Sequence, residues 1–216
     1  ALVEPLLPHL RSWHDSTVRD GEVGKWLYEE TWVEHQASVS AGSESFGTWL
    51  VMAHSGSESI QIPLYSWLEE QGADLRILTP SENRSGLLAQ LKDAGDNFRG
   101  AICLIGAQTE RDLGSALVMS QALADASLKC PMWIITQRAV VVDSTDWVHP
   151  SLGSCWGLGR TIAWENPETW GGLIDLPKEP EDEDIAILGN TLNAAGISGE
   201  LVIRGQRLWE RKLLRK

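Results

Sequence analysis

Short apolar runs alternate with helical patterns along most of the chain from Trp49 onward. Several of these runs are apolar at almost every position, as expected of strands covered on both faces of a parallel sheet. The six runs are Trp49–Ala53, Leu75–Leu78, Ala101–Ile105, Met132–Thr136, Gly172–Leu176 and Leu201–Ile203. Their alternation with helices predicts an α/β fold, with a doubly wound, mostly parallel sheet and helices on both faces.

Helices are predicted between these runs because apolar residues recur at spacings of three and four. The five predicted helices are Ile60–Leu68, Leu87–Leu91, Thr109–Ala124, Ser151–Trp164 and Asp182–Ala195. We expect Pro63 near the first turn of the first helix and Gly72 after its end. The apolar face of the third is predicted to comprise Leu113, Ala116, Leu117, Ser120, Leu123 and Ala124. The acidic stretch Glu179–Asp184 is predicted to be the solvated start of the last helix, where the helix dipole favours negative charge.

The two ends of the chain depart from this alternation. Residues 1–24 are predicted to be a linker or a short helix at a domain boundary, which leaves residues 25–216 as one α/β domain. Gly24–His35 is predicted to form an extra strand with Leu27, Thr31 and Val33 on one side. The basic stretch Gln206–Lys216 is predicted to be a strand that leaves the sheet. It could be a tether into a following domain or a solvated edge strand protected by its charge.

Composition narrows the classes of partner. The 216 residues carry a formal net charge of −12, which argues against nucleic acid or an anionic membrane as a partner. No run reaches the roughly 18 apolar residues of a membrane span, and we expect no signal peptide. The three cysteines, Cys103, Cys130 and Cys155, lack a paired spacing. We therefore expect reduced thiols that pack in the core of a cytoplasmic protein.

Gly153, Gly157 and Gly159 have the spacing G-x-x-x-G-x-G, which is that of the phosphate-binding turn of short-chain dehydrogenases. That turn must directly follow a strand, whereas a polar segment with Pro150 precedes these glycines. The segment fits a helix better, because one stripe is apolar or small at helical spacing. The stripe comprises Leu152, Cys155, Trp156, Gly159, Ile162 and Ala163. We therefore expect the glycines to allow close packing of a backbone or a large ring, with Trp156 and Trp164 as candidates.

The turn after the first apolar run is where a dinucleotide would bind in such a sheet. It reads HSGSESIQIP and contains one glycine, Gly56. Glu58 stands at the start of the following helix, where its charge would repel a pyrophosphate. The sequence therefore predicts no cofactor-binding residues in this turn.

Catalytic patterns are also absent from the sequence. The reductase motif Y-x-x-x-K fails, because Trp32 lies four residues after Tyr28 and Glu69 lies four after Tyr65. The sequence has no H-x-x-x-H pair for a metal and no G-x-S-x-G elbow for acyl transfer. His54 and Ser55 could pair as base and nucleophile, but without an elbow we expect an ordinary loop. We therefore assign no catalytic, cofactor-binding or metal-binding residue.

The segment Cys155–Pro177 (CWGLGRTIAWENPETWGGLIDLP) resembles the W-G-L-G-R…E-x-P…W-G-G-L-x-D-L-P signature of a polyketide synthase family. That family is the structural subdomain of modular polyketide synthase ketoreductases, a truncated Rossmann-like fold. Trp26–Trp32 resembles its opening strand, Pro131–Val142 its strand before the signature, and Glu200–Arg215 its closing strands.

The resemblance implies a division of labour. Such ketoreductases have two Rossmann-like halves, and the first binds no cofactor and supports the second, which carries NADPH and the catalytic Ser, Tyr and Lys. The chain would then be no enzyme on its own. By chain order, Ser151–Trp164 occupies the place of the Tyr/Lys helix, so that helix would have become a packing element. The expected partner is the catalytic subdomain. An enoylreductase or methyltransferase domain of the same module is left open.

Two alternatives come from other classes. One is an autonomous Rossmann-type reductase that binds NAD(P), against which the broken glycine turn and the missing proton donor argue. The other is a module that docks a carrier protein or another domain, which the sequence neither supports nor excludes.

Overall fold

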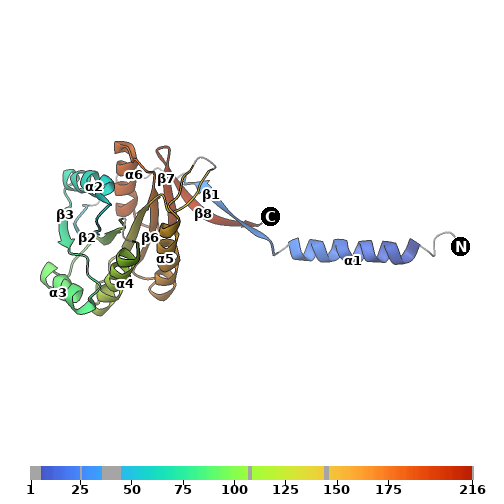
Figure 1. Ribbon diagram of the computed structural model, residues 1–216, viewed down its shortest axis with the longest axis horizontal. Coiled ribbons are helices and arrows are strands. Elements are labelled where there is room, and N and C mark those ends of the chain that lie inside the picture. Colours follow the sequence, from blue (N-terminus) through green and yellow to red (C-terminus); the bar gives the residue numbers. More distant parts are fainter. Residues whose placement is uncertain (1–5, 25, 36–44, 107–108, 144–145, 216) are drawn as a thin grey trace. The chain divides into compact units, whose positions relative to one another are not determined.

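The computed structural model describes residues 6–24, 26–35, 45–106, 109–143 and 146–215. Its elements are α1 (Leu7–Gly24), β1 (Tyr28–Glu34), β2 (Thr48–Ala53), α2 (Glu58–Glu70), β3 (Asp74–Leu78), α3 (Arg84–Ala94), β4 (Gly100–Leu104), α4 (Thr109–Asp125), β5 (Met132–Gln137), the short 3₁₀ turn η2 (Pro150–Leu152), α5 (Gly153–Glu165), β6 (Trp170–Leu176), α6 (Asp182–Asn193), β7 (Gly199–Arg204) and β8 (Arg207–Arg215) (Figure 1). All six predicted strands and all five predicted helices are confirmed.

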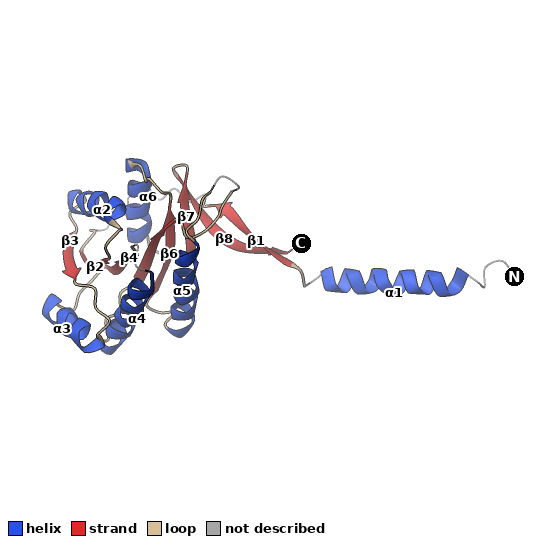
Figure 2. Ribbon diagram, in the orientation of Figure 1, coloured by secondary structure: helices blue, strands red, loops and turns tan. Residues whose placement is uncertain are grey.

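One eight-stranded sheet has the order β1-β8-β7-β6-β5-β4-β2-β3. The pairs from β3 through β2, β4, β5 and β6 to β7 are all parallel, whereas β7 and β8 are antiparallel. Helices lie on both faces of the sheet (Figure 2). The predicted fold class, a doubly wound and mostly parallel α/β sheet, is therefore confirmed.

Alternate residues of each central strand enter different cores, because side chains alternate across a sheet. Trp49 and Val51 of β2 belong to the core that Leu64 of α2 and Leu188 of α6 complete. Helices α3, α4 and α5 contact one another in sequence, α3 with α4 and α4 with α5. Because both faces are covered, the central strands are apolar almost throughout, as their sequences predicted.

The chain divides into two compact units, Glu34–Glu210 and a smaller one that combines residues 1–33 with residues 211–216. The larger unit contains strands β2 to β7 and helices α2 to α6. In the smaller unit, the segment predicted to be a linker or a short helix contains the 18-residue helix α1. Trp13 of this helix is 67% exposed.

Three local expectations were wrong: the position of Pro63 in its helix, and the burial of Leu117 and of Ala124. Pro63 lies inside α2 instead of its first turn. In α4 the buried face includes Asp112, Ser115 and Met119, while Leu117 is 38% exposed and Ala124 is exposed. The face is rotated because Asp112 accepts a hydrogen bond from the Gly106 N–H and must point inward.

The start of α6 is confirmed, with one difference in its environment. Glu181 caps the helix, and its side chain and that of Asp184 form a reciprocal capping box. Such a box satisfies backbone N–H groups that the first helical turn leaves free. Asp184 is buried, however, so the acidic stretch is not solvated throughout.

The basic strand β8 is not the edge of the sheet, because β1 lies outside it in the strand order. Arg207 pairs with Glu34 at 3.3 Å, and Arg211 pairs with Glu30. The alternative of a solvated edge strand is therefore wrong, since acidic residues of β1 neutralise part of its charge. The alternative of a tether stays a prediction.

Candidate functional site

In a doubly wound sheet, ligands bind outside the carboxyl ends of the strands, where the strand order reverses. Here that point lies between β2 and β4, because the chain continues from β2 to β3 on one side and from β4 to β5 on the other. A crevice of about 190 Å³ lies there, lined by Gly56, Ile105, Gly106, Gln137, Arg138, His149 and Leu152. This volume is smaller than the roughly 300 Å³ at which ligand sites for small molecules begin.

The turn between β2 and α2 holds a carboxylate where a phosphate would sit. The Gly56 N–H donates to both carboxylate oxygens of Glu58, at distances of 3.0 and 2.9 Å. This hydrogen bond lowers the pKa of the exposed Glu58 carboxyl below its usual value. The start of α2 therefore carries a negative charge of its own, at the place where a bound pyrophosphate would need free N–H donors.

The loops after β2 and β4 meet backbone to backbone. A Cβ atom added to Gly106 would lie 2.1 Å from the carbonyl oxygen of Ser55, so only glycine fits there. The Gly106 N–H donates to the buried Asp112 carboxylate at 3.0 Å. On the other side, the His54 N–H donates to the Leu104 carbonyl at 3.1 Å. These contacts narrow the crevice between the two strand ends.

His54 and Ser55, weighed in the sequence as a base and a nucleophile, have separate surroundings. The imidazole Nδ1 of the buried His54 lies 2.9 Å from the Leu104 carbonyl oxygen, whereas Ser55 is exposed. Since a carbonyl only accepts, Nδ1 carries the proton in this contact. The imidazole therefore bridges two strand ends, as an ordinary loop residue does.

A second cluster of polar groups occupies the carboxyl ends of β5, β6 and β7. The Thr136 hydroxyl donates to Asp175 Oδ1 at 2.6 Å, and the Ala139 N–H donates to the same oxygen at 2.8 Å. Arg204 Nη2 donates to Asp175 Oδ2 at 2.6 Å. Burial raises the pKa of the Asp175 carboxyl, and the charge of Arg204 and the hydrogen bond from Thr136 oppose that rise.

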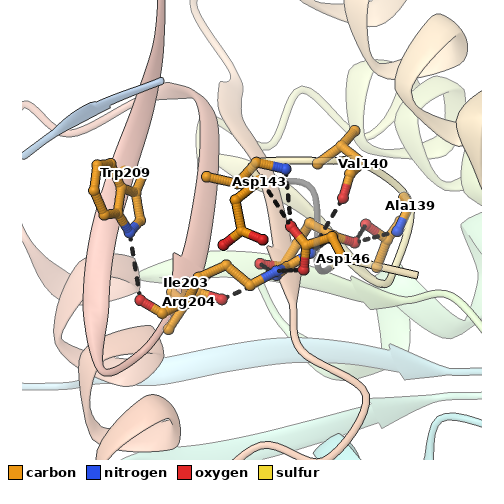
Figure 3. A network of polar contacts seen from close by, with 10 residues as sticks. Ala139, Val140, Asp143, Asp146, Ile203, Arg204 and Trp209 are labelled. Carbon is orange, nitrogen blue, oxygen red and sulfur yellow. Dashed lines mark hydrogen bonds and ion pairs between the residues drawn. The ribbon is translucent and has the colours of Figure 1, made fainter. Parts of the chain in front are cut away.

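Arg204 also fixes the loop between β5 and α5. Its Nε donates to Asp146 Oδ1 at 2.9 Å and its Nη2 to the Val140 carbonyl at 3.3 Å. Asp146 in turn accepts the Val142 N–H at 2.8 Å. Figure 3 shows Arg204, Asp146 and the backbone of Val140 converging on one another. The guanidinium group is thus satisfied by the protein itself, with its side chain 12% exposed.

Sequence reasoning did not identify this network. Two signals were present, however: Asp175 is charged inside the apolar strand GGLIDL, and Arg204 ends the apolar run LVIR. Charged residues are rarely buried without a partner, so a charge in each of two core strands indicates an ion pair. That the two strands are neighbours followed only from the sheet order.

The inner side of helix α5 includes the buried residues Cys155 and Trp156. The Trp156 Nε1–H donates to the Thr136 hydroxyl at 3.1 Å. Cys155 is buried on the same side, and burial raises the pKa of its thiol to about 12. A thiol with such a pKa stays protonated at neutral pH and is a poor nucleophile. The predicted buried stripe of this helix is confirmed for Leu152, Cys155, Trp156, Gly159 and Ile162.

The three glycines of α5 differ in what they pack against. A Cβ added to Gly159 would lie 2.7 Å from the Leu173 side chain, so close packing is confirmed there. Gly153 and Gly157 have no atom within 4 Å of such a Cβ, so the expected close packing was wrong for both. Trp164, expected to be one of the packing rings, is 89% exposed. The spacing G-x-x-x-G-x-G thus combines one core position with two surface positions.

The described residues contain neither a candidate metal-binding group nor a helix that could span a membrane. No group of three or more His, Cys, Asp or Glu side chains in the described ranges is placed to hold a metal ion. Among the same residues, no helix has both the length and the apolar character needed to cross a membrane. All three cysteines are free and buried, which confirms them as packing residues.

Comparison with solved structures shows likeness to ketoreductases. The chain is 29% identical to a C2-type ketoreductase from a modular polyketide synthase, with a TM-score of 0.74, over 88% of this chain and 44% of that one. A match to A-type ketoreductases from a modular polyketide synthase has 26% identity and covers 89% of this chain and 43% of that one, with a TM-score of 0.73. An alcohol dehydrogenase from Thermococcus sibiricus shares the fold alone, with 13% identity and a TM-score of 0.51 over 73% of this chain and 96% of that one.

Sequence comparison gives the family. The chain is 34% identical over 210 residues to the pikromycin polyketide synthase component PikAIII of Streptomyces venezuelae. This match covers 95% of this chain and 13% of that protein. The chain thus spans a small part of this relative. Residues 31–213 match the family described as polyketide synthase extender module SpnB, Rossmann fold domain. This chain therefore belongs to the Rossmann fold domain family of polyketide synthase extender module SpnB.

Proposed function

We propose that this chain is the structural, non-catalytic half of a polyketide synthase ketoreductase. In this proposal it supports a second half, which binds NADPH and reduces β-ketoacyl intermediates on a carrier protein. The observation that carries the proposal is the Glu58 carboxylate on the Gly56 N–H, because it fills the place of the cofactor phosphate with a like charge.

The shape of the cofactor position supports the same conclusion. The Ser55 carbonyl abuts Gly106, and the crevice that remains measures about 190 Å³. A dinucleotide needs the backbone of the first turn to approach its pyrophosphate, and here that approach is taken by the protein's own carboxylate. Binding would require both the displacement of Glu58 and the separation of two packed loops.

The catalytic position supports it independently. The resemblance implies that a catalytic reductase has its tyrosine and lysine on the helix at the chain-order position of α5, so that the phenol can give its proton to the substrate. In the same place α5 presents Trp156, bound to Thr136. Tyr65 lies on α2, on the other face of the sheet, and burial raises the pKa of its phenol to about 12. It therefore has neither the position nor the acidity of a proton donor.

The relatives fit a half-domain. The chain covers 44% and 43% of two ketoreductase structures, so each contains further chain that could form the second half. The catalytic subdomain is accordingly the partner we propose, and NADPH the cofactor of that partner. The expected cytoplasmic location and the boundary at residue 24 stay predictions.

The experiment that tests this is a calorimetric titration of the isolated chain with NADPH. We expect no binding in the micromolar range, which corresponds to about −8 kcal/mol. The intact ketoreductase polypeptide that includes this chain is the positive control. Micromolar affinity of the isolated chain would overturn the proposal and favour the autonomous reductase.

A variant at Glu58 tests whether the charge or the shape of the cofactor position prevents NADPH from binding. Glu58→Gln removes the negative charge and keeps the size of the side chain. Because the Ser55–Gly106 contact remains, we expect this variant to bind no NADPH either. Micromolar affinity in the variant would show that the carboxylate alone excludes the cofactor and that the crevice can open.

A further inference from the structure

Arg138 lines the crevice at the strand ends without a carboxylate partner among the described residues. It directly follows β5 and shares the crevice wall with Gly56 and His149. Its Nε–H is buried, and no described residue accepts that hydrogen. A buried polar group without a hydrogen-bond partner is costly, and the cost is higher for a charged group. The described part of the chain therefore leaves this guanidinium group with an unmet need for an acceptor.

Other arginines of the chain show the usual solution. The chain has 30 acidic residues against 18 lysines and arginines, so acidic partners are abundant. Arg84 Nη2, for example, lies 2.5 Å from Asp125 Oδ1. The guanidinium carbon of Arg138 instead lies 5.0 Å from the centroid of the Trp147 ring. Such a contact holds the flat face of a guanidinium group and leaves its N–H edge for an acceptor.

The backbone holds Arg138 in a conformation that arginine rarely adopts. Its φ is +62°, in the left-handed region, where a residue other than glycine is strained. Its N–H donates to the Leu176 carbonyl at 3.0 Å, and its carbonyl accepts the His149 N–H at 2.8 Å. A glycine at this position would make the same two bonds without strain, so they do not require an arginine. Strained residues of this kind cluster at binding and catalytic sites.

The crevice has room for a small ligand. Its volume of about 190 Å³ equals that of about six water molecules, which suffices for one phosphate or carboxylate group but not for a nucleotide. His149 Nδ1 lies 2.7 Å from the Ser151 hydroxyl oxygen. When that hydroxyl donates to Nδ1, the neutral imidazole carries its proton on Nε2 and can donate it to a ligand. An arginine and a histidine thus share a crevice of the size of one small anion.

We propose that this crevice binds one small oxyanion, a phosphate or a carboxylate group, on the guanidinium group of Arg138. A guanidinium group pairs with both kinds of oxyanion through two parallel N–H donors. His149, on the same wall, is the second donor. The proposal goes beyond the proposed function and does not depend on it, because an anion can bind here whether or not a catalytic half is present.

Glu58 limits the size of this ligand. Its carboxylate occupies the Gly56 N–H, and Gly56 forms part of the crevice wall. A pyrophosphate would need that N–H as well, whereas a single oxyanion on Arg138 does not. Because Glu58 is exposed, water and salt screen its repulsion of an anion. The crevice therefore excludes a dinucleotide and accepts one small anion.

The Nε–H resonance of Arg138 in a two-dimensional ¹⁵N NMR spectrum tests the site directly. At constant ionic strength, we expect phosphate to shift this resonance saturably, with a Kd of about 1 mM or below. The Arg84 Nε–H, which Asp125 already accepts, is the internal control and should not shift. Acetate is titrated in parallel, so that tighter binding of one anion assigns the site to phosphate or to carboxylate groups. The absence of a saturable shift with either anion up to about 20 mM would overturn the proposal.

A matched pair of variants tests the role of Arg138. Arg138→Gln removes the charge and should weaken phosphate binding at least about tenfold, as followed at the His149 backbone amide, because hydrogen bonds from charged groups are the strong ones. Arg76→Gln removes an equal charge from an exposed arginine that pairs with Asp74, and it should leave the affinity unchanged. Equal weakening in both variants would mean a general attraction to positive charge and would overturn the site.

Arg138→Gly separates ligand binding from a role in folding. This substitution relieves the strained φ and removes the contact with Trp147, and these two effects on stability have opposite signs. We expect the thermal unfolding midpoint to change by less than about 3 °C, and phosphate binding to be lost. A much larger fall of the midpoint, with phosphate binding unchanged, would assign Arg138 to the fold and overturn the proposal.

Discussion

The two sides of α5 show how one helix can serve two different purposes. Its inner side is filled: Trp156 donates to Thr136, and Gly159 packs against Leu173. Its outer side is bare: Gly157 has no neighbour within 4 Å of a Cβ, and Trp164 is 89% exposed. The same residue types, glycine and tryptophan, are thus core elements on one side and surface elements on the other.

The difference shows that the core of the domain fixes one side of this helix and leaves the other side exposed. The inner side meets Thr136, which leads to the buried pair of Asp175 and Arg204. A buried ion pair of this kind contributes little net stability. Removing one partner is costly, however, because the other charge then stays buried without a partner and without water around it. The inner side is therefore sensitive to substitution, and the outer side is free to vary unless a partner covers it.

The largest effect is expected from Arg204→Ala. The substitution leaves the fully buried Asp175 carboxylate without its cation, which costs about 3–5 kcal/mol of unfolding free energy. Urea unfolding of the isolated chain measures it. Arg160→Ala is the control, since Arg160 pairs with Glu200 on the surface and its loss should cost about 1 kcal/mol or less. Equal losses in both variants would refute a special role of the buried pair.

The cost of Arg204→Ala should depend on pH. Burial already raises the pKa of Asp175, and loss of the opposing positive charge raises it further. A carboxyl whose pKa is higher in the folded state binds its proton there first, so its contribution to stability is greatest at low pH and declines as pH rises through the folded-state pKa. The difference in urea midpoint between wild type and variant should thus be larger at neutral pH than at acid pH. A constant difference would count against this assignment.

The next largest loss of stability is expected from Gly159→Ala. The added methyl group would lie 2.7–2.9 Å from three atoms of the Leu173 side chain, so the core must shift. Overpacking of this kind costs about 1–3 kcal/mol. Thermal unfolding followed by circular dichroism would report it as a lower midpoint. An unchanged midpoint would mean that Leu173 adjusts freely and that the inner side is looser than its contacts indicate.

Gly157→Ala should increase the stability of the isolated chain, whereas Gly159→Ala should decrease it. With no atom within 4 Å of the new methyl group, the substitution removes the cost of glycine in a helix without creating a clash. It should stabilise the isolated chain by about 0.5–1 kcal/mol. The two variants differ by two positions on one helix and make the same chemical change. Destabilisation by Gly157→Ala would contradict the contrast between the two sides of α5.

The smallest effect on the isolated chain is expected from Trp164→Ser. Because the indole is 89% exposed, its removal should change the unfolding free energy by less than about 0.5 kcal/mol. The matched substitution on the inner side is Trp156→Ser, which removes a buried ring and should cost about 3–5 kcal/mol. Urea unfolding of both variants measures the two losses of unfolding free energy. Comparable losses would show that Trp164 packs on the domain itself.

The expectations about α5 show where sequence reasoning succeeded and where it failed. The stripe from Leu152 to Ile162 was predicted correctly, because helical spacing fixes which residues share a side. The packing of the glycines was predicted correctly for Gly159 alone, since the sequence does not show what lies opposite each side. In α4 the apolar pattern was overridden by Asp112, which turns inward to the Gly106 N–H.

The sequence by itself determined the strands, the helices between them and the parallel, doubly wound sheet, because apolar periodicity records local burial. It also placed Glu58 at the start of α2, since that position depends on a short turn. Only the tertiary structure decided that Asp175 and Arg204 form a pair, that Ser55 closes on Gly106, and that Gly157 is bare where Gly159 is packed. The physical reason is that each of these depends on an atom distant in the chain, which no local pattern specifies.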